Sequence, residues 1–169
     1  MFLYSLVFNL AFNKVISGVG YMINIRAIQS KDFENWLVVY QHYADHYKIE
    51  LSDKGIKVTW SWLLAKEHPL KGIVAEQGVT LIGLAHYRAM PSPLRGKNIG
   101  FLDDLIVLPK NRGSNAARML LDELKMIAKS EEWGVIRWIT RDNNYRARSL
   151  YDQLAQKTDW NMYEMSIDA

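Results

Sequence analysis

The sequence predicts an α/β fold of the α+β kind, in which helices pack on a mixed sheet. Stretches with strand-like patterns and stretches with helical periodicity follow one another in the order β-α-α-β-β-β-α-β-α-β. Hydrophobic residues make up 49% of the 169 residues, which is enough for one compact core and argues against disorder. The chain has no repeat, linker or low-complexity tract. We therefore expect a single domain.

Three kinds of signal place the elements of the first half of the chain. Short apolar or alternating runs indicate strands, apolar residues three and four apart indicate helices, and a preceding Ser or Asp can cap a helix. The pair Gln77-Gly78 between two strand patterns indicates a hairpin. The predicted elements are a strand at 23–28, a helix capped by Ser30 with Phe33, Trp36, Leu37, Tyr40, Ala44 and Tyr47 on one side, a helix from Asp53 that ends before Pro69, and strands at 72–76 and 79–90.

The second half contains the strongest helical pattern of the chain. Residues 114–129 keep apolar side chains at helical spacing, and Gly134 stops this helix. Residues 91–97 contain two prolines and a glycine, which is typical of a loop. The remaining predicted elements are a strand at 101–108, a strand at 135–140, a helix at 145–154 and a final strand at 162–167.

Residues 102–121 read as strand, glycine-containing turn and helix, in that order. The start of a helix has unpaired backbone N–H groups and a partial positive charge, so it attracts phosphate. Gly113 has no side chain to keep a ligand from the backbone. Lys110, Arg112 and Arg118 add positive charge around the same turn. We therefore expect an anion-binding turn for a nucleotide-like cofactor.

Composition excludes several other classes of site. The net charge is only +3 and acids are interspersed among the basic residues, so no nucleic-acid partner is expected. The absence of cysteine excludes disulfides, thiolate zinc sites and a cysteine nucleophile, and it fits a cytoplasmic protein. His42 and His46 are one helical turn apart but lack the glutamate of an HExxH motif, so no metal is predicted.

Residues 1–21 form a hydrophobic extension before the predicted domain at 22–169. Asn9, Asn13 and Lys14 interrupt the extension, and no basic residue precedes its apolar stretch. It therefore matches neither a membrane span nor a signal peptide well, and a membrane partner is not expected. Three interpretations stay open: an extension outside the domain, an extension packed on it, or a membrane or export signal.

Three motifs in this element order resemble the GNAT superfamily of acetyl-CoA-dependent N-acetyltransferases. Residues 112–117 look like the R/Q-x-x-G-x-G/A pyrophosphate loop, with Asn115 where glycine is usual. Asn tolerates left-handed backbone angles better than most residues do. Residues 144–151 look like N-x-x-A-x-x-L-Y, and residues 103–109 look like the acidic strand before the loop. The resemblance covers residues 22–168 and is closest to the branch of yeast histone and polyamine acetyltransferases and their bacterial relatives.

The resemblance implies a mostly antiparallel sheet with helices on both faces, and a site for acetyl-CoA as cosubstrate. In this family the strand that here ends at Val107 splays from the strand at 135–140, and the pantetheine arm lies between them. Members often form dimers, so the resemblance allows a homodimer. The cofactor-binding residues that it implies are Leu105, Ile106, Val107, Arg112, Gly113, Ser114, Asn115, Ala116, Ala117, Arg118, Asn144, Arg148 and Tyr151, with Lys110, Arg118 or Arg148 near the adenosine phosphate.

The resemblance also implies a reaction, in which a primary amine of a small amine, polyamine or protein lysine attacks the thioester directly in a ternary complex. An amine at pH 7 is mostly protonated, and a carboxylate can remove that proton. The candidates are Asp103 and Asp104, which should point to opposite faces of the strand, and we favour Asp104. Tyr151 matches the family's general acid for the thiolate, although a packed core aromatic is the alternative.

The acceptor should lie against the first two helices, as in the family. Tyr43, His46 and Tyr47, together with Asp103, suit a cationic amine through cation–π and charge attraction. His86 is a further candidate base, unless it is an ordinary core or surface histidine. The alternative function is a catalytically silent CoA-binding sensor or interaction module.

Overall fold

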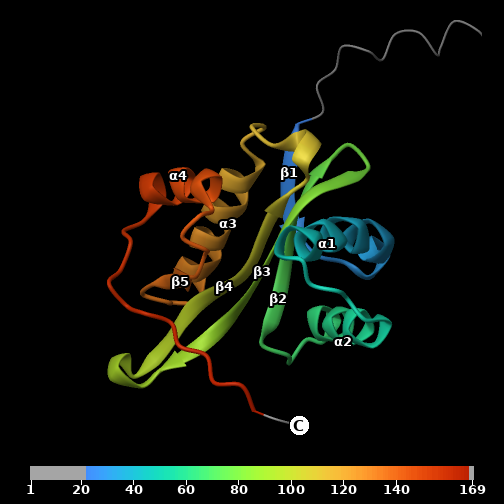
Figure 1. Cartoon of the computed structure of the whole chain (residues 1–169). Helices are drawn as coiled ribbons and strands as arrows, with labels where there is room; N and C mark the ends of the chain where they lie inside the picture. Colours follow the sequence, from blue (N-terminus) through green and yellow to red (C-terminus); the bar gives the residue numbers. More distant parts are fainter. Residues whose placement is uncertain (1–21, 168–169) are drawn as a thin grey trace, which may run out of the picture.

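The computed structural model describes residues 22–167, so the apolar extension at 1–21 and its three interpretations lie outside the described residues. A five-stranded sheet in the order β1-β2-β3-β4-β5 separates two helical layers, with α1 and α2 on one face and α3 and α4 on the other (Figure 1). The strands are β1 Ile23–Ala27, β2 Leu70–Gln77, β3 Thr80–Ser92, β4 Lys97–Val107 and β5 Ile136–Trp138. The helices are α1 Phe33–Tyr47, α2 Asp53–Leu64, α3 Ala116–Ser130 and α4 Tyr145–Leu154, with 3-10 turns η1 Ser30–Asp32, η2 Pro93–Arg95 and η3 Pro109–Asn111.

The sheet is mixed and mostly antiparallel, as predicted. Strands β1 to β4 pair in antiparallel fashion, and β5 pairs with β4 in parallel. The β4–β5 pairing joins only residues 100–102 to residues 136–138. Gly100 lets the Trp133 ring and β5 approach β4, because a Cβ there would lie 2.6 Å from a ring carbon of Trp133 and 3.2 Å from Cγ1 of Ile136. Beyond Leu102, β4 continues to Val107 without β5 beside it, so the two strands open into a wedge.

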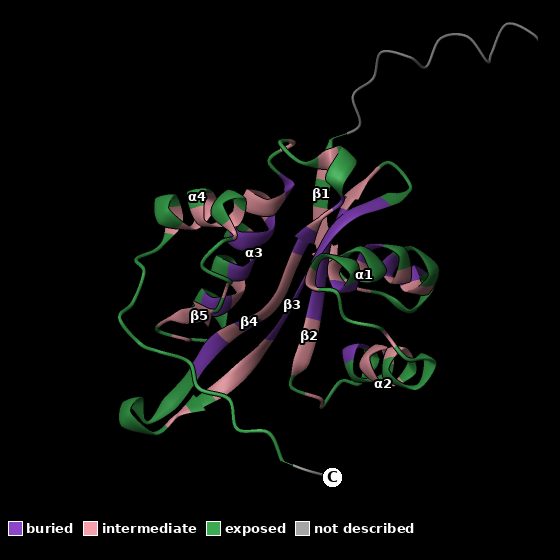
Figure 2. Ribbon diagram, in the orientation of Figure 1, coloured by how far each residue is buried: buried purple, intermediate pink, exposed green. Residues whose placement is uncertain are grey.

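Each face of the sheet carries its own apolar core, visible as the buried residues between the layers (Figure 2). Toward α3 and α4, side chains of the sheet pack on Leu120 and Leu124 of α3, which are 0% and 1% exposed. Toward α1 and α2, the sheet packs on Trp36 and Val39 of α1, both 0% exposed. These two packed layers hold the wedge between them.

Several element boundaries differ from the sequence prediction. Ser30 begins the 3-10 turn η1 rather than capping a helix, and α1 starts at Phe33. The predicted loop at 91–97 shortens to the turn at 93–96, since β3 runs to Ser92 and β4 starts at Lys97. The strand predicted at 135–140 shortens to Ile136–Trp138, where β4 pairs with it.

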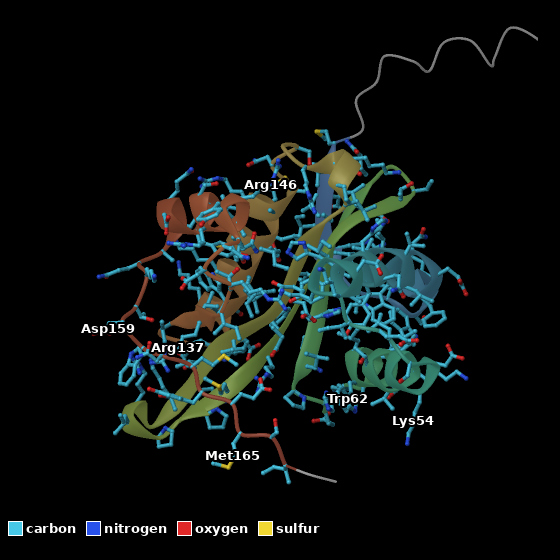
Figure 3. The ribbon with its side chains drawn as sticks, in the orientation of Figure 1. Lys54, Trp62, Arg137, Arg146, Asp159 and Met165 are labelled. Carbon is cyan, nitrogen blue, oxygen red and sulfur yellow. The ribbon has the colours of Figure 1, made fainter. Side chains whose placement is uncertain are left out.

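The final strand predicted at 162–167 is wrong. Residues 156–167 contain no helix or strand, and they leave α4 on the β5 side of the molecule. Asp159 and Met165 mark their path in Figure 3. A strand needs a neighbouring strand to satisfy its backbone hydrogen bonds, and an apolar alternation cannot supply that neighbour.

Among residues 22–167, no helix is both long enough and apolar enough to span a membrane.

Candidate functional site

A cavity of about 570 Å³ occupies the wedge between β4 and β5. Its walls come from the C-terminal end of α1, the second half of β4, the turn before α3, the segment after β5, and α4. Most of the predicted site residues line it together, although they come from distant parts of the chain: Tyr43, His46, Tyr47, Asp103, Leu105, Ile106, Val107, Arg112, Gly113, Asn115, Ala116, Ala117, Arg118, Asn144 and Tyr151. The lining does not include Asp104, Ser114 or Arg148.

The turn before α3 has the backbone shape that its sequence suggested. Asn115 is the N-cap of α3 and has φ +73°, the left-handed conformation that glycine usually supplies. Gly113 has φ +88°, and a Cβ there would meet no atom within 4 Å. Asn at the usual glycine position is therefore compatible with the turn.

The same turn holds polar groups that the described protein leaves unsatisfied. Two buried side-chain oxygens between residues 22 and 167 have no hydrogen-bond partner, and they are Asn111 Oδ1 and Ser114 Oγ. The first backbone N–H groups of α3 also have no carbonyl partner within the helix. Buried polar groups normally find partners, so this turn is suited to a polar ligand.

The two neighbouring carboxylates of β4 lie on one face of the sheet, and the prediction that they point to opposite faces is wrong. The β3–β4 register shifts, so that His86 opposes Asp104 while Tyr87 opposes Leu102, which leaves Asp103 as an extra residue. Such a β-bulge resets the alternation of side chains. Asp104 contacts His86 and Asp103 contacts Arg88, which are two residues apart on β3 and therefore share a face.

The two carboxylates have different partners. The guanidinium Nε of Arg88 donates to both oxygens of Asp103, at 3.0 and 3.1 Å. Burial raises the pKa of Asp103 above its ordinary value, although Arg88 opposes this shift. Oδ2 of Asp104 lies 2.7 Å from Nδ1 of His86, whose Nε2 accepts a hydrogen bond from the indole N–H of Trp36 at 3.0 Å.

A row of aromatic residues on α1 leads from the core to the cavity. Trp36, Tyr40, Tyr43 and Tyr47 follow one another with ring centroids 4.8 to 6.5 Å apart. The hydroxyl of Tyr43 donates to the carbonyl oxygen of Asp103 at 3.4 Å. The pKa of Tyr43 is raised, mainly by burial and then by the nearby Asp104 carboxylate. Tyr43 is therefore a neutral phenol at ordinary pH.

Tyr151 lies on the opposite wall, on α4. Its ring packs edge-on against Trp138 of β5, with centroids 5.4 Å apart. Burial raises the pKa of Tyr151 to about 12. The phenol thus keeps its proton at neutral pH and is a potential proton donor within the cavity.

Asn144 connects α4 to the segment after β5. Its Oδ1 accepts from the backbone N–H of Ala147 at 3.4 Å and so caps the helix, and its Nδ2 donates to Oγ1 of Thr140 at 3.1 Å. The amide thus has partners within the protein, and its role as a pantetheine ligand stays a prediction.

The arginines around the cavity divide into two groups. Arg118 lines the cavity and donates to Oε1 of Gln153 at 3.0 Å. Arg148 turns away, because its Nη1 donates to the carbonyl oxygen of Asp142 at 2.6 Å. Arg146 of α4, labelled in Figure 3, lines the cavity although the sequence reading did not select it. Arg146 could have been selected from the sequence, because it directly precedes Ala147 of the N-x-x-A motif.

Sequence reasoning also missed other parts of the site. The wall includes Trp138, Ile139, Thr140 and Leu150. Arg88 holds Asp103, and Trp36 holds the His86 ring that contacts Asp104. No group of three or more His, Cys, Asp or Glu side chains within the described part of the chain could hold a metal ion.

Comparisons with known proteins agree with this geometry. The family model described as Acetyltransferase (GNAT) family matches residues 32–155. A D-amino-acid N-acetyltransferase of Saccharomyces cerevisiae, HPA3, is 27% identical over 146 residues, which cover 84% of this chain and 89% of HPA3. An uncharacterized N-acetyltransferase of Bacillus subtilis, YhfO, is 26% identical over 137 residues, which cover 81% of this chain and 91% of YhfO.

Solved structures show the same fold. A ribosomal-protein-alanine N-acetyltransferase from Brucella melitensis biovar Abortus 2308 superimposes with a TM-score of 0.74 at 20% identity, covering 87% of this chain and all of that chain. The aminoglycoside N-acetyltransferase AAC(6')-Iy, solved in complex with CoA, has a TM-score of 0.74 at 16% identity and covers 88% of this chain and 97% of its own. The chain therefore belongs to the GNAT family of acetyltransferases, and it is an acyltransferase.

Proposed function

We propose that the protein transfers an acetyl group from acetyl-CoA to a primary amine by direct attack within a ternary complex. The observation that supports this most strongly is the wedge itself. It lies where β4 leaves β5, with an anion-compatible turn along one wall and two carboxylates and a protonated tyrosine close to the others. A chain that only sensed CoA would need the turn but not this pairing of acid and base groups.

The donor set of the cavity fits acetyl-CoA. The backbone N–H groups at the start of α3 suit a pyrophosphate, and Arg112 and Arg118 line the same wall. The edge of β4 between Leu105 and Val107, which β5 leaves open, suits the amides of a pantetheine arm. Bound there, acetyl-CoA would supply a thioester whose C–S bond breaks as the C–N bond forms.

The residues of the wedge would then divide the proton transfers between two walls. A carboxylate of β4 takes a proton from the ammonium of the acceptor, because only the neutral amine is nucleophilic. Tyr151 gives its proton to the thiolate as the C–S bond breaks, so that coenzyme A leaves as the neutral thiol. A free N–H group of β4 can polarise the carbonyl oxygen, for which no side chain is required.

A carboxylate-bearing amine is a specific candidate for the acceptor. The guanidinium of Arg141 lies 4.9 Å from the ring centroid of Tyr47, which lines the cavity, and no acidic side chain between residues 22 and 167 forms an ion pair with it. An amino acid could place its ammonium group toward Asp103 and its carboxylate toward Arg141. The similarity to HPA3, named a D-amino-acid N-acetyltransferase, supports this choice.

The acceptor class can be tested by measuring kcat and KM for D- and L-amino acids and for their carboxamides. Polyamines and lysine peptides are measured in the same way for comparison. We expect Arg141→Gln to raise KM for the amino acids and to leave KM for their carboxamides almost unchanged. Equal kcat/KM for an amino acid and its carboxamide would contradict a carboxylate subsite. Preference for polyamines or lysine peptides would assign the acceptor to those classes instead.

A homodimer is the remaining proposal. Trp160, Met162, Tyr163, Met165 and Ile167 after α4 are 64–90% exposed, and an apolar surface of this kind is usually covered. We expect the full chain to elute as a dimer in size-exclusion chromatography with light scattering. The double variant Trp160→Ser and Tyr163→Ser should shift it toward the monomer, whereas a monomeric full chain would contradict the proposal.

The reaction itself is tested by incubating the enzyme with acetyl-CoA and an amine panel, and by following free thiol and acetylated amine together. We expect both products in equal amounts, and we expect acetyl-CoA alone to raise the melting temperature. Release of thiol without an acetylated amine would contradict transfer to an amine.

A further inference from the structure

His86 is a buried histidine whose protonation state follows from its two neighbours. The ring is 1% exposed, and His86 pairs with Gly72 of β2 in the sheet. The indole N–H of Trp36 can only donate, so Nε2 of His86 must be the unprotonated acceptor. The proton of a neutral ring is then on Nδ1, which donates to Oδ2 of Asp104 at 2.7 Å.

This arrangement keeps His86 uncharged. A second proton on Nε2 would face the N–H of Trp36, so two donors would meet inside a dry core. The short contact to Asp104 is therefore a hydrogen bond from a neutral ring rather than an ion pair. Asp103, by contrast, is bonded to the permanently charged guanidinium of Arg88. Of the two carboxylates, Asp104 has the partner that does not neutralise its charge.

Tyr43 connects Asp104 to the cavity. Asp104 does not line the cavity, whereas Tyr43 does. The Tyr43 hydroxyl now donates to the carbonyl oxygen of Asp103 at 3.4 Å, a long hydrogen bond, and it is close enough to the Asp104 carboxylate for the two to interact electrostatically. A rotation of the phenolic O–H can therefore redirect it to the carboxylate.

We propose that Asp104 receives the proton of the acceptor amine through the hydroxyl of Tyr43, and that His86, fixed by Trp36, is the positioning residue that orients Asp104. The inference rests on the proposed amine acetylation. The ammonium gives a proton to the Tyr43 oxygen while the Tyr43 hydroxyl proton passes to Oδ1 of Asp104. The amine becomes neutral, the phenol is unchanged, and Asp104 carries the proton until solvent removes it after transfer.

We call the path from the amine through the Tyr43 hydroxyl to Asp104 the relay, and its neighbours among the described residues are as follows. His86 is packed against Trp36 and Tyr40 of α1, and the ring centroids of Tyr40 and His86 are 5.4 Å apart. The side chain of Thr59 of α2 interacts with the Tyr40 hydroxyl. The charged groups near Asp104 are Asp103 and, through it, Arg88. The Asp103–Arg88 pair therefore forms the charged surroundings of the relay.

Two substitutions of His86 separate positioning from packing. Asn has its amide nitrogen where His has Nδ1, so His86→Asn keeps a donor for Asp104 and loses the bond to Trp36. Gln reaches the position of Nε2, so His86→Gln keeps an acceptor for Trp36 and loses the donor for Asp104. We expect kcat of His86→Asn to stay within about threefold of the wild type and that of His86→Gln to fall by about 100-fold, the low end of general-base effects.

In both variants KM for acetyl-CoA should be unchanged, since neither touches the α3 turn. A mere packing role predicts the reverse order of kcat, because Gln fills the buried site better and satisfies Trp36. Equal losses in both variants would also overturn the positioning role. Tyr43→Phe should lower kcat as much as His86→Gln does, and a Tyr43→Phe enzyme with wild-type kcat would overturn the relay.

The protonation state can be measured without any turnover. In the full-length protein labelled with ¹⁵N-histidine, we expect His86 to show a protonated Nδ1 and an unprotonated Nε2 at neutral pH. An imidazolium, or a proton on Nε2, would overturn the inference even if the enzyme acetylates amines. A correct tautomer in a protein that acetylates no amine would instead count against the proposed function.

Discussion

Two clusters of acidic side chains lie in different parts of the sheet, one at β1 and one at β4, and have different partners. At the β1 edge, Arg26 donates to Asp32 at 2.7 and 2.9 Å and to Glu76 at 2.7 and 3.2 Å. At β4, Asp103 is bonded to Arg88, and Asp104 is bonded to a neutral histidine. None of the three residues of the β1 cluster lines the cavity, whereas the β4 cluster borders it.

The comparison separates carboxylates that stabilise the fold from carboxylates that are free to react. Hydrogen bonds from Arg26 lower the pKa values of Asp32 and Glu76, so both stay ionised and link β1, η1 and β2. Burial raises the pKa of Asp103, and Asp104 has no direct cationic partner. We therefore expect substitutions at the β1 edge to change stability and substitutions at β4 to change the rate.

The largest effect on rate is expected for Asp104→Asn. It removes the proposed proton acceptor and keeps the shape of the side chain, so kcat should fall by about 10²- to 10⁴-fold. The melting temperature should change little, because an amide oxygen can still accept from His86. Initial rates with saturating acetyl-CoA test this. Asp103→Asn is the matched control, and we expect its kcat to fall less. A greater loss in Asp103→Asn would reassign the base.

Tyr151→Phe should reduce kcat by about 100-fold, since the thiolate would leave without a proton donor. The pH profile gives a second check. Because the folded pKa of Tyr151 is about 12 and its ordinary value is 10, Tyr151 should cause no loss of activity below pH 10. The same upward shift makes its contribution to stability complete below pH 10 and progressively lost as pH rises toward 12. A phenylalanine variant with unchanged kcat would make Tyr151 a packing residue.

Arg26→Met should show the opposite pattern, with stability reduced and kcat unchanged. Removing the cation from two partly buried carboxylates should cost roughly 3 kcal/mol in the free energy of unfolding at pH 7. Asp32 and Glu76 have folded pKa values below their ordinary 3.8 and 4.5, so this stabilisation is present above those values and is lost as pH falls through the folded ones. Urea unfolding at pH 7 and pH 3 should therefore show a difference from wild type that shrinks in acid.

The smallest effects are expected at Asn115. Asn115→Ala forces a residue with a Cβ and no local hydrogen bonding into a left-handed conformation, which should cost about 1 kcal/mol of stability and weaken acetyl-CoA binding. Asn115→Gly should keep or improve both, because glycine adopts φ +73° without strain. Thermal unfolding and calorimetric titration with acetyl-CoA test the pair. Weaker binding by the glycine variant would show that the Asn side chain itself contributes.

The local parts of this fold and site could be predicted from the sequence. Helix α4 has the predicted bounds Tyr145–Leu154, and the turn at 112–117 leads into a helix as expected. These features depend on residues close together in the chain, such as a capping Asn144 and an Asn that tolerates positive φ. The family resemblance then indicated that these separate local motifs line one cavity.

The remainder depends on pairing between distant strands. Whether Asp103 and Asp104 share a face is decided by the register of β4 against β3, and one extra residue in a bulge reverses the answer. The tautomer of His86 requires Trp36, fifty residues away, to donate to it. The strand predicted at 162–167 had a suitable pattern but no neighbouring strand among the described residues.

The central claim is that the wedge between β4 and β5 carries out acetyl transfer with the carboxylates of β4 as base. The most direct measurement is mass spectrometry of an amine panel incubated with acetyl-CoA and equal amounts of wild type, Asp104→Asn or Arg26→Met. The account predicts an acetylated amine with wild type and Arg26→Met, and almost none with Asp104→Asn. Product with Asp104→Asn at the wild-type rate, or no product with wild type although acetyl-CoA raises its melting temperature, would contradict it.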